Sequence, residues 1–151
     1  MTRQVTLEAL VSDADADTVF ARLADFERYP EFTDAVREVR VTEREDGVID
    51  SAWAVNFRNG VLRWSENEVI DPAARTITFA QTTGDFESFD GTWRVEERDG
   101  GVVIRFEAEF DLGMASLAAI IDPIAERALV ENLQRILTGL NGPSTSYPGR
   151  A

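Results

Sequence analysis

The first third of the chain changes from strand-like alternation to helical spacing. Val5, Leu7, Ala9 and Val11 alternate with polar residues, which predicts a first β-strand. Ser12 or Asp13 then stands where a helix N-cap is expected, and apolar residues at helical spacing follow over residues 19–24. Pro30 in "DFERYPEF" (residues 25–32) ends this helix and begins a second short one. The pattern therefore predicts one strand followed by two short helices.

The middle of the chain alternates apolar and polar residues between turn signals. Asp46-Gly47, Asn59-Gly60 and Asp99-Gly100 are dipeptides that favour tight β-hairpin turns, because both central residues of a type I′ turn need positive φ. The alternating segments around them predict six further strands, at residues 36–45, 48–57, 61–70, 75–82, 87–98 and 101–112. With the first strand, the prediction is an antiparallel sheet of about seven strands.

Beyond Met114 the apolar residues return to helical spacing, which predicts a long amphipathic C-terminal helix ending near Gly139. Asp122-Pro123 predicts either a kink in this helix or the start of a new one. Its apolar face is expected to hold Leu117, Ile121, Ile124, Leu129, Leu133, Ile136, Leu137 and Leu140. Residues 141–151, rich in Gly, Pro and Ser, predict a flexible tail after a single domain at 1–140. The fold class is α+β, a curved sheet wrapped around one helix.

The hairpin turns predict which side chains share the inner face of the sheet. A two-residue loop at Asn59-Gly60 places Trp53 opposite Glu66 and Ser51 opposite Glu68, and directly paired residues lie on one face. The same argument at Asp99-Gly100 pairs Val95 with Ile104, Trp93 with Phe106, Gly91 with Ala108 and Phe89 with Phe110. Ile77, Phe79 and Gln81 are the expected inner residues of strand 75–82.

The hairpin at Asp46-Gly47 leaves two alternatives. A two-residue loop would turn Arg40, Thr42 and Arg44 inward, whereas a three-residue loop with a bulge would turn Val39 and Val41 inward. We favour the bulge.

The predicted inner face combines aromatic residues with a few polar ones, which is typical of a small-molecule site. The carboxyl groups of Glu66 and Glu68 are the candidate catalytic pair, since two carboxyls in an apolar pocket should not both ionise easily. For single aromatic residues, ordinary core packing is the simpler interpretation. The glutamates could also lie at a rim in water or pair with Arg40 or Arg44. The candidate substrate-binding residues are Ser51, Trp53, Trp64, Phe79, Gln81, Phe89, Trp93, Phe106, Ala108 and Phe110.

The composition excludes several kinds of chemistry. The chain has 151 residues with no His and no Cys, and all 15 basic residues are Arg. Histidine bases, Ser-His-Asp triads, thiolates and Schiff-base lysines are therefore ruled out, and we expect neither a metal nor a cofactor. A net charge of −13 disfavours nucleic acid. No apolar run reaches the ~18 residues of a membrane span, so we expect a soluble cytoplasmic protein, monomeric or homodimeric.

Residues 3–140 resemble the SRPBCC, or helix-grip, superfamily, which includes START lipid-binding domains and polyketide cyclase/dehydrase proteins. The resemblance is carried by "VFARLADFERYPEFTDAVREVRV" (residues 19–41) with its Tyr29-Pro30-Glu31 signature, and by "NGVLRWSENEVI", "GTWRVEERDGG" and "FEAEFDL" in the strands. It implies a deep pocket between the sheet and the C-terminal helix. In aromatase/cyclase members, Arg and Tyr side chains in that pocket steer the closure of poly-β-ketone chains.

This chain departs from the aromatase/cyclase pattern at the implied catalytic positions. The Tyr position falls on Val36, one Arg position on Glu68, and a second on Ala80 or Gln81. The leading hypothesis is a cofactor-independent polyketide cyclase/dehydratase that uses Glu66 and Glu68 on a hydrophobic oxygenated substrate, which an acyl carrier protein would present. The alternative is a non-catalytic carrier or chaperone for a quinone, lipid or pathway intermediate. A third interpretation is a stress or toxin–antitoxin protein of the same fold that acts through partners. An exposed apolar patch would support it, but the predicted outer faces of the sheet are polar.

Overall fold

The computed structural model describes residues 2–43, 48–57, 60–112 and 118–148. Strand β1 (Arg3–Ser12) leads into helix α1 (Ala16–Ala24), a 3-10 turn η1 (Phe26–Arg28) and the short helix α2 (Tyr29–Phe32). The chain ends in the long helix α3 (Ala118–Asn141) and the two-residue strand β8 (Thr145–Ser146). The six strands between the helices are β2 (Val36–Glu43), β3 (Val48–Phe57), β4 (Gly60–Asp71), β5 (Thr76–Gly84), β6 (Ser88–Arg98) and β7 (Gly101–Asp111).

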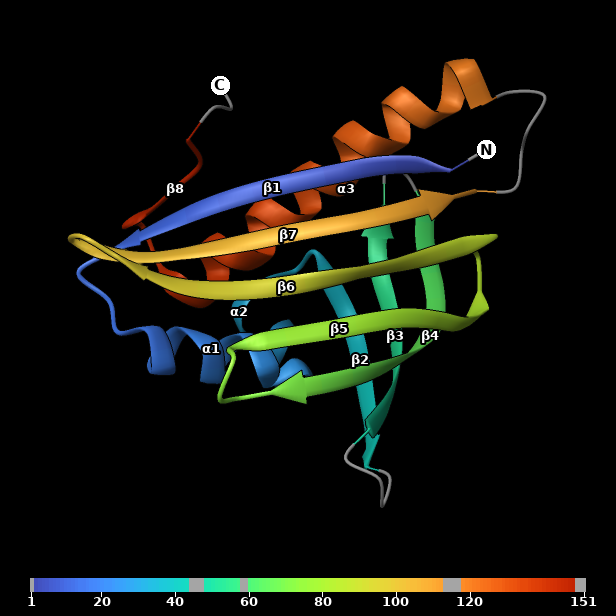
Figure 1. The fold of residues 1–151 in the computed structure, drawn as a ribbon. Coiled ribbons are helices and arrows are strands. Elements are labelled where there is room, and N and C mark those ends of the chain that lie inside the picture. The colour runs from blue at the N-terminus through green and yellow to red at the C-terminus, as the bar shows by residue number, and fades with distance from the viewer. Residues whose placement is uncertain (1, 44–47, 58–59, 113–117, 149–151) are drawn as a thin grey trace.

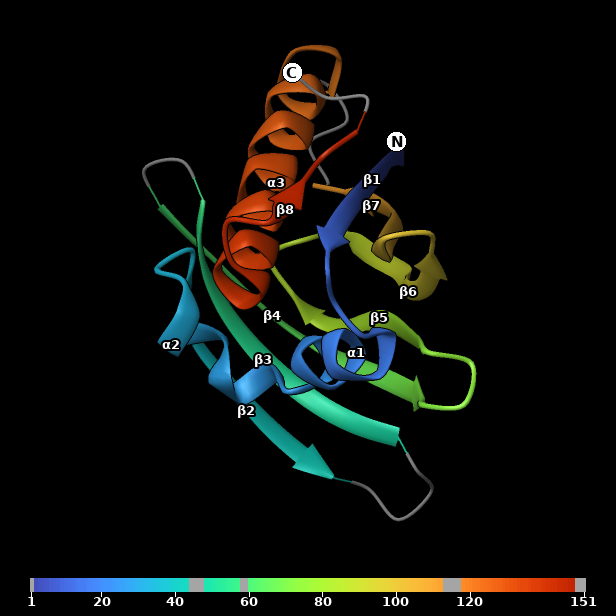
Figure 2. The same cartoon turned by 90° about the vertical axis from the view of Figure 1, so that its left-hand side faces the viewer.

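The strands form one antiparallel sheet in the order β2-β3-β4-β5-β6-β7-β1-β8. In Figure 1, β1, β7, β6 and β5 run alongside one another across the view, whereas β2 and β3 run at a steep angle to them. Figure 2 shows α3 lying over one face of the curved sheet, with α1 and α2 beyond the C-terminal end of α3. The predicted α+β helix-grip architecture is confirmed, with β8 as an eighth strand.

The β3–β4 hairpin has a different register from the predicted one, but the predicted inner face is correct. Phe57 pairs with Gly60, so Trp53 lies opposite Trp64 and Ser51 opposite Glu66. The predicted partners of Trp53 and Ser51 were each two residues further along β4. Side chains alternate with a period of two, so a shift of two residues changes the partners and keeps the face. The loop residues 58 and 59 lie outside the described residues.

The other strand predictions agree closely with the structure. The β6–β7 pairs Val95–Ile104, Trp93–Phe106, Gly91–Ala108 and Phe89–Phe110 are confirmed. In β2, Val39 is buried and pairs with Trp53, while Arg40 is exposed and pairs with Ala52. The inward-facing valines predicted by the bulged alternative are thus confirmed, although the Asp46-Gly47 turn itself lies outside the described residues.

The start of α1 differs from the prediction. Asp15, rather than Ser12 or Asp13, is the N-cap, and its Oδ2 accepts hydrogen bonds from the backbone N and the hydroxyl of Thr18, both at 3.0 Å. Ser12 still belongs to β1, and Asp13 has φ of 54°, a left-handed turn conformation that Asp tolerates. The strand therefore extends further than its apolar alternation, and the helix begins after the turn.

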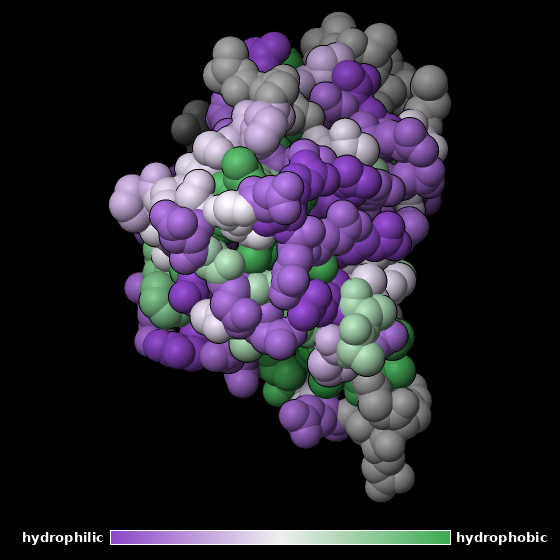
Figure 3. Space-filling model, turned by 60° about the vertical axis from the view of Figure 1, so that its left-hand side comes forward, coloured by the Kyte–Doolittle hydropathy of each residue, from purple (hydrophilic) through white to green (hydrophobic). Residues whose placement is uncertain are grey.

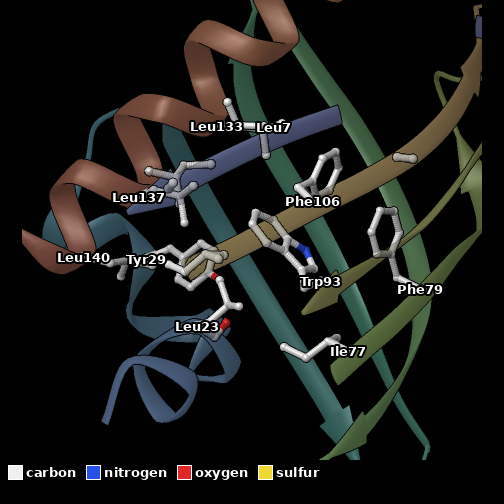
Figure 4. Packing of buried hydrophobic residues seen from close by; sticks show 14 of the residues in the cluster. Leu7, Leu23, Tyr29, Ile77, Phe79, Trp93, Phe106, Leu133, Leu137 and Leu140 are labelled. Carbon is white, nitrogen blue, oxygen red and sulfur yellow. Dashed lines mark hydrogen bonds between the residues drawn. The ribbon is translucent and has the colours of Figure 1, made fainter. Parts of the chain in front are cut away.

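Helix α3 supplies one wall of the core. It runs through Pro123 as a single helix, so the new-helix alternative is wrong. Figure 4 shows Leu133 of α3 near Leu7 and Phe106 of the sheet, and Leu140 near Tyr29. The prediction that Ile124 lies on this face is wrong, since Ile124 is 41% exposed. The buried stripe passes through Ala125, Ala128 and Leu129, which places residue 124 at its outer side.

The segment after α3, for which we predicted a flexible tail, returns to the sheet at its described end. Thr145 and Ser146 pair with Val11 and Leu10 of β1. The Tyr147 hydroxyl donates to the backbone oxygen of Gln134 at 2.7 Å and lies 2.5 Å from the Thr138 hydroxyl. These contacts attach residues 145–147 to both β1 and α3.

Gly139 allows a close approach between α3 and the C-terminal end of α2. A Cβ at this position would lie 2.4 Å from the backbone oxygen of Phe32 and 3.3 Å from Thr33 Cβ. Gly139→Ala is therefore expected to destabilise the protein by about 1–3 kcal/mol, despite the higher helix propensity of Ala. Urea unfolding followed by circular dichroism measures the effect. The exposed Arg127→Ala in the same helix is the control and should stay within about 0.5 kcal/mol of wild type. Equal stability of the two variants would contradict the close approach.

Candidate functional site

A small internal cavity lies between the inner face of the sheet and helix α3. Its volume is about 60 Å³. Pockets for drug-sized ligands are usually about 300–1,000 Å³, so a long ligand would require aromatic side chains to move aside. The described residues that border it are Phe26, Tyr29, Trp53, Val55, Leu62, Trp64, Glu66, Ile77, Phe79, Phe86, Phe89, Trp93, Phe106, Leu129, Asn132, Leu133 and Ile136.

Two carboxyl groups lie side by side on the inner face of β4. Glu66 and Glu68 are two residues apart, so both side chains leave the strand on the same side. Glu66 is 6% exposed and Glu68 is 1% exposed, although carboxylates are almost never fully buried without a partner. The rim interpretation is therefore wrong. Arg40 is exposed and forms an ion pair with Glu38, so its pairing with the buried glutamates is wrong as well. Arg44 lies outside the described residues.

Indole and hydroxyl groups hold the two carboxyl groups. Trp64 Nε1 donates to Glu66 Oε1 at 2.5 Å. Trp53 Nε1 donates to Ser51 Oγ at 2.6 Å, and Ser51 Oγ donates to Glu68 Oε2 at 2.5 Å. The two indoles are stacked, with an interplanar angle of 3° and ring centroids 6.0 Å apart. Each tryptophan thus contributes an apolar face to the interior and a polar edge to the carboxyl pair.

Burial changes the protonation of both glutamates. Loss of hydration raises the pKa of Glu66 well above its ordinary value, and the adjacent Glu68 raises it further, while the Trp64 indole acts in the opposite direction. The pKa of Glu68 is also raised by burial, but hydrogen bonds from Glu66, Ser51 and Trp53 counteract this rise. The pair therefore retains a proton at pH values where exposed glutamates are ionised.

Seven of the twelve residues predicted for the site border the cavity. These residues are Trp53, Trp64, Glu66, Phe79, Phe89, Trp93 and Phe106. Ser51 and Glu68 do not border it, and they connect to it through Glu66 and Trp53. Gln81 lies opposite Glu66 on β5 and donates through Nε2 to the backbone oxygen of Phe86 at 2.9 Å. Ala108 and Phe110 are core residues of β7 away from the cavity wall.

Several cavity residues were missed because they come from segments other than the strands used for prediction. Tyr29 and Phe26 belong to "DFERYPEF", and the buried Tyr29 hydroxyl donates to the backbone oxygen of Leu23 at 2.5 Å. Phe86 lies in the β5–β6 connection. Asn132 of α3 donates to the backbone oxygen of Asn56 at 2.6 Å. A polar residue on the apolar stripe of the C-terminal helix was the available signal for Asn132.

The outer surface offers weaker candidates. A groove of about 420 Å³ on the opposite face of the sheet is bordered by Glu38, Arg40, Ala52, Arg63, Ser65 and Thr83, among others, and contains no buried ionisable group. Figure 3 shows mostly hydrophilic residues on one side of the molecule. Phe32, Val69 and Ile124, which are large, hydrophobic and exposed, lie on three separate elements. Among the described residues no acidic cluster suits a metal ion, and no helix is long and apolar enough to cross a membrane.

The raised pKa of Glu66 predicts a specific pH dependence of stability. Above the ordinary glutamate pKa the unfolded chain loses a proton that folded Glu66 keeps, so this residue lowers the free energy of unfolding as pH rises through its folded pKa. Glu66→Gln removes the titration and keeps an oxygen for the Trp64 indole. We expect its stability relative to wild type to increase between pH 5 and pH 8, as measured by urea unfolding at several pH values.

The exposed Glu87→Gln is the control for losing one negative charge from a chain with net charge −13. Its stability should follow wild type across the same pH range. A constant difference between Glu66→Gln and wild type at every pH would show that Glu66 titrates as an ordinary carboxyl.

The comparisons with known proteins agree with this geometry. A family model described as polyketide cyclase/dehydrase and lipid transport matches residues 12–137. A search of the curated proteins gave no match. Among solved structures, the protein TTHA0849 from Thermus thermophilus is similar, with a TM-score of 0.83 and 22% identity, covering 92% of this chain and 94% of that one.

Two further structures have the same fold. The Zhui aromatase/cyclase from Streptomyces sp. R1128 has a TM-score of 0.77 and 22% identity, covering 93% of this chain and 94% of that chain. A START superfamily protein from Mycobacterium smegmatis has a TM-score of 0.73 and 17% identity, with 93% and 96% covered. These likenesses concern the fold, and the family model spans most of the sequence. The chain therefore belongs to the polyketide cyclase/dehydrase and lipid transport family.

Proposed function

We propose that this protein is a cofactor-independent cyclase/dehydratase acting on a hydrophobic, oxygenated substrate of the polyketide type. The observation that carries the proposal is Glu66, a buried carboxyl with a strongly raised pKa that borders an aromatic cavity. An acid that stays protonated near neutral pH can donate a proton to a substrate oxygen, which an exposed glutamate cannot do efficiently. Glu68 is the second member of the acid/base pair.

The chemistry requires only proton transfer. In an aldol closure, the enol carbon of a poly-β-ketone attacks a carbonyl carbon, and Glu66 donates its proton to that carbonyl oxygen as the C–C bond forms. The proton released from the enol oxygen returns to the carboxyl, so the acid is regenerated. In the following dehydration, the carboxyl protonates the departing hydroxyl, and the proton lost from carbon restores it. One water leaves, and no oxidant, metal or cofactor enters the balance.

The cavity lining would hold the carbon skeleton by contact with aromatic faces. Trp53, Trp64, Phe86 and Phe89 form edge-to-face and stacked pairs around the Glu66 end of the cavity. The described lining contains no arginine, so a carboxylate or phosphate group is a poor ligand for the interior. A substrate attached to an acyl carrier protein would therefore keep its charged linker outside, with only the neutral chain entering.

A synthetic methyl-capped tetraketone, which closes an aromatic ring with loss of water, tests the proposal. Wild type should accelerate its conversion to the phenolic product over buffer, as followed by chromatography. Glu66→Gln should lower this acceleration by about 10²–10⁴-fold, the usual contribution of a general acid or base. Glu68→Gln should lower it by less, because Glu68 does not border the cavity.

The exposed Glu87→Gln should retain wild-type turnover in the same assay. Full turnover by Glu66→Gln would remove the catalytic role, and so would a wild-type rate no higher than that of buffer.

A non-catalytic carrier of a neutral hydrophobic ligand is the second candidate, and the composition of the cavity wall favours it. Apart from the indole nitrogens, the described lining has polar side-chain groups only on Tyr29, Glu66 and Asn132. The Tyr29 hydroxyl and the Asn132 amide nitrogen already donate to backbone oxygens. Such a wall binds apolar surface and makes few specific polar contacts.

Native mass spectrometry of the freshly purified protein distinguishes a carrier from an enzyme. A carrier should retain a hydrophobic ligand of one mass, and incubation with the protein should leave that ligand chemically unchanged. Substituting Trp93→Ala, which removes a large cavity side chain without touching the carboxyl pair, should change the amount or mass of bound ligand. Conversion of the released ligand by fresh wild-type protein would contradict the carrier function.

A further inference from the structure

The two carboxyl groups of the site have unequal surroundings. Glu68 stands at the end of a hydrogen-bond chain that begins at the Trp53 indole and passes through the Ser51 hydroxyl. Because Ser51 Oγ already accepts the indole N–H, its own proton is directed to Glu68 Oε2. A donor that is itself hydrogen-bonded to a further donor is polarised, which strengthens the final bond to a carboxylate. Glu66 receives a single bond from the Trp64 indole.

Two buried acceptor oxygens without partners flank Glu66. Glu68 Oε1 is on the same face of β4, and Gln81 Oε1 belongs to the residue directly opposite Glu66 on β5. Directly opposite residues have Cβ atoms about 4.5–5.5 Å apart. An amide oxygen only accepts hydrogen bonds, and so does an ionised carboxylate. A proton on Glu66 gives one of these two acceptors a donor on the cavity side of the pair.

We propose that Ser51 and Trp53 are positioning residues that keep Glu68 as the carboxylate, so that the exchangeable proton stays on Glu66, the member of the pair that borders the cavity. This proposal rests on the proposed function, because it assigns the acid of that reaction to Glu66. Ser51 does not border the cavity and acts through Glu68. Glu68 then serves as the charge that retains the proton on its neighbour, at a depth the substrate does not reach.

Further titratable groups lie around the pair. Asp50 of β3 disfavours a negative charge on Glu68. Tyr29 of α2 is buried, and its pKa is raised well above the ordinary value, first by burial and then by Glu66 and Glu68, so it stays neutral. Burial is the largest cause of the raised pKa at both glutamates; hydrogen bonds from Glu66, Ser51 and Trp53 lower the pKa of Glu68, and the bond from the Trp64 indole lowers the pKa of Glu66.

Carboxyl-carbon NMR of protein labelled at glutamate Cδ tests the assignment without a substrate. The Glu66 and Glu68 signals are identified from the Glu66→Gln and Glu68→Gln spectra. In the wild-type protein, Glu68 should titrate in the lower-pH step and Glu66 in the higher-pH step. The reverse order, or simultaneous titration of both carbons, overturns the proposal.

Ser51→Ala tests the positioning role. Loss of the hydroxyl should strengthen proton binding at Glu68 by about tenfold, the size expected for one hydrogen bond to a charged group. The lower-pH step should therefore move to higher pH and become visible at both carbons. Ser51→Thr keeps the hydroxyl and should restore the wild-type order. Unchanged titration of both carbons in Ser51→Ala, or failure of Ser51→Thr to restore them in a folded protein, overturns the role of Ser51.

The result separates this inference from the proposed function. If Glu66→Gln abolishes tetraketone conversion while Ser51→Ala leaves both titrations unchanged, the catalytic function stands and the positioning role falls. If the titrations follow the expected order and Glu66→Gln retains full conversion, the assignment of the proton to Glu66 is supported and the catalytic function is contradicted.

Discussion

Two carboxyl groups on the concave face of β4 must be accommodated in an apolar interior, and the surrounding side chains depend on that constraint. An unpaired buried carboxylate is costly enough that a protein usually leaves the group protonated or supplies donors to it. Here the donors are two indoles and a serine on the adjacent strands, at 2.5–2.6 Å from their acceptors. The aromatic cavity is therefore also the scaffold of the polar pair, since Trp53 and Trp64 belong to both.

Aromatic rings from the helical segment and from the sheet pack around the two indoles that donate to the carboxyl pair. Tyr29 and Phe26, from the segment between α1 and β2, form edge-to-face contacts with the Trp53 ring, at centroid distances of 5.5 Å and 5.4 Å. On the other side, Trp64 meets Phe86 and Phe89 at 5.6 Å and 5.7 Å. Rings on both sides limit the motion of the indoles, and fixed indoles keep their N–H groups directed at the carboxyl pair. Packing and electrostatics thus reinforce each other at this end of the core.

The sequence was sufficient to predict the strands and the inner face of the sheet, because side chains still alternate between the two faces when the predicted register is wrong by two residues. The β3–β4 hairpin illustrates this: its pairing was wrong by two residues, yet Glu66, Glu68, Trp53 and Trp64 were all assigned correctly to the inside. Which inner-face residues border the cavity could not be predicted in the same way. It depends on sheet curvature, on the bulge between Ser65 and Glu66, and on the position of α3, all of which follow from packing between distant segments. Phe86 and Asn132 border the cavity for that reason, while Gln81 and Glu68 lie on the correct face without reaching it.

The departure from the arginine and tyrosine pattern of aromatase/cyclases has a physical counterpart in the structure. A cation stabilises an enolate as an anion, so a site built on arginine works through charge. A neutral carboxyl instead transfers a proton to the oxygen and avoids the anion, which suits an interior whose described lining has no basic group. If Glu68 contacted the substrate directly in place of a cation, its negative charge would destabilise an enolate anion. In the proposed mechanism, Glu68 lies one step behind Glu66 and is held by Ser51, so that its charge opposes ionisation of Glu66 and keeps an acid available in a chain that has no histidine.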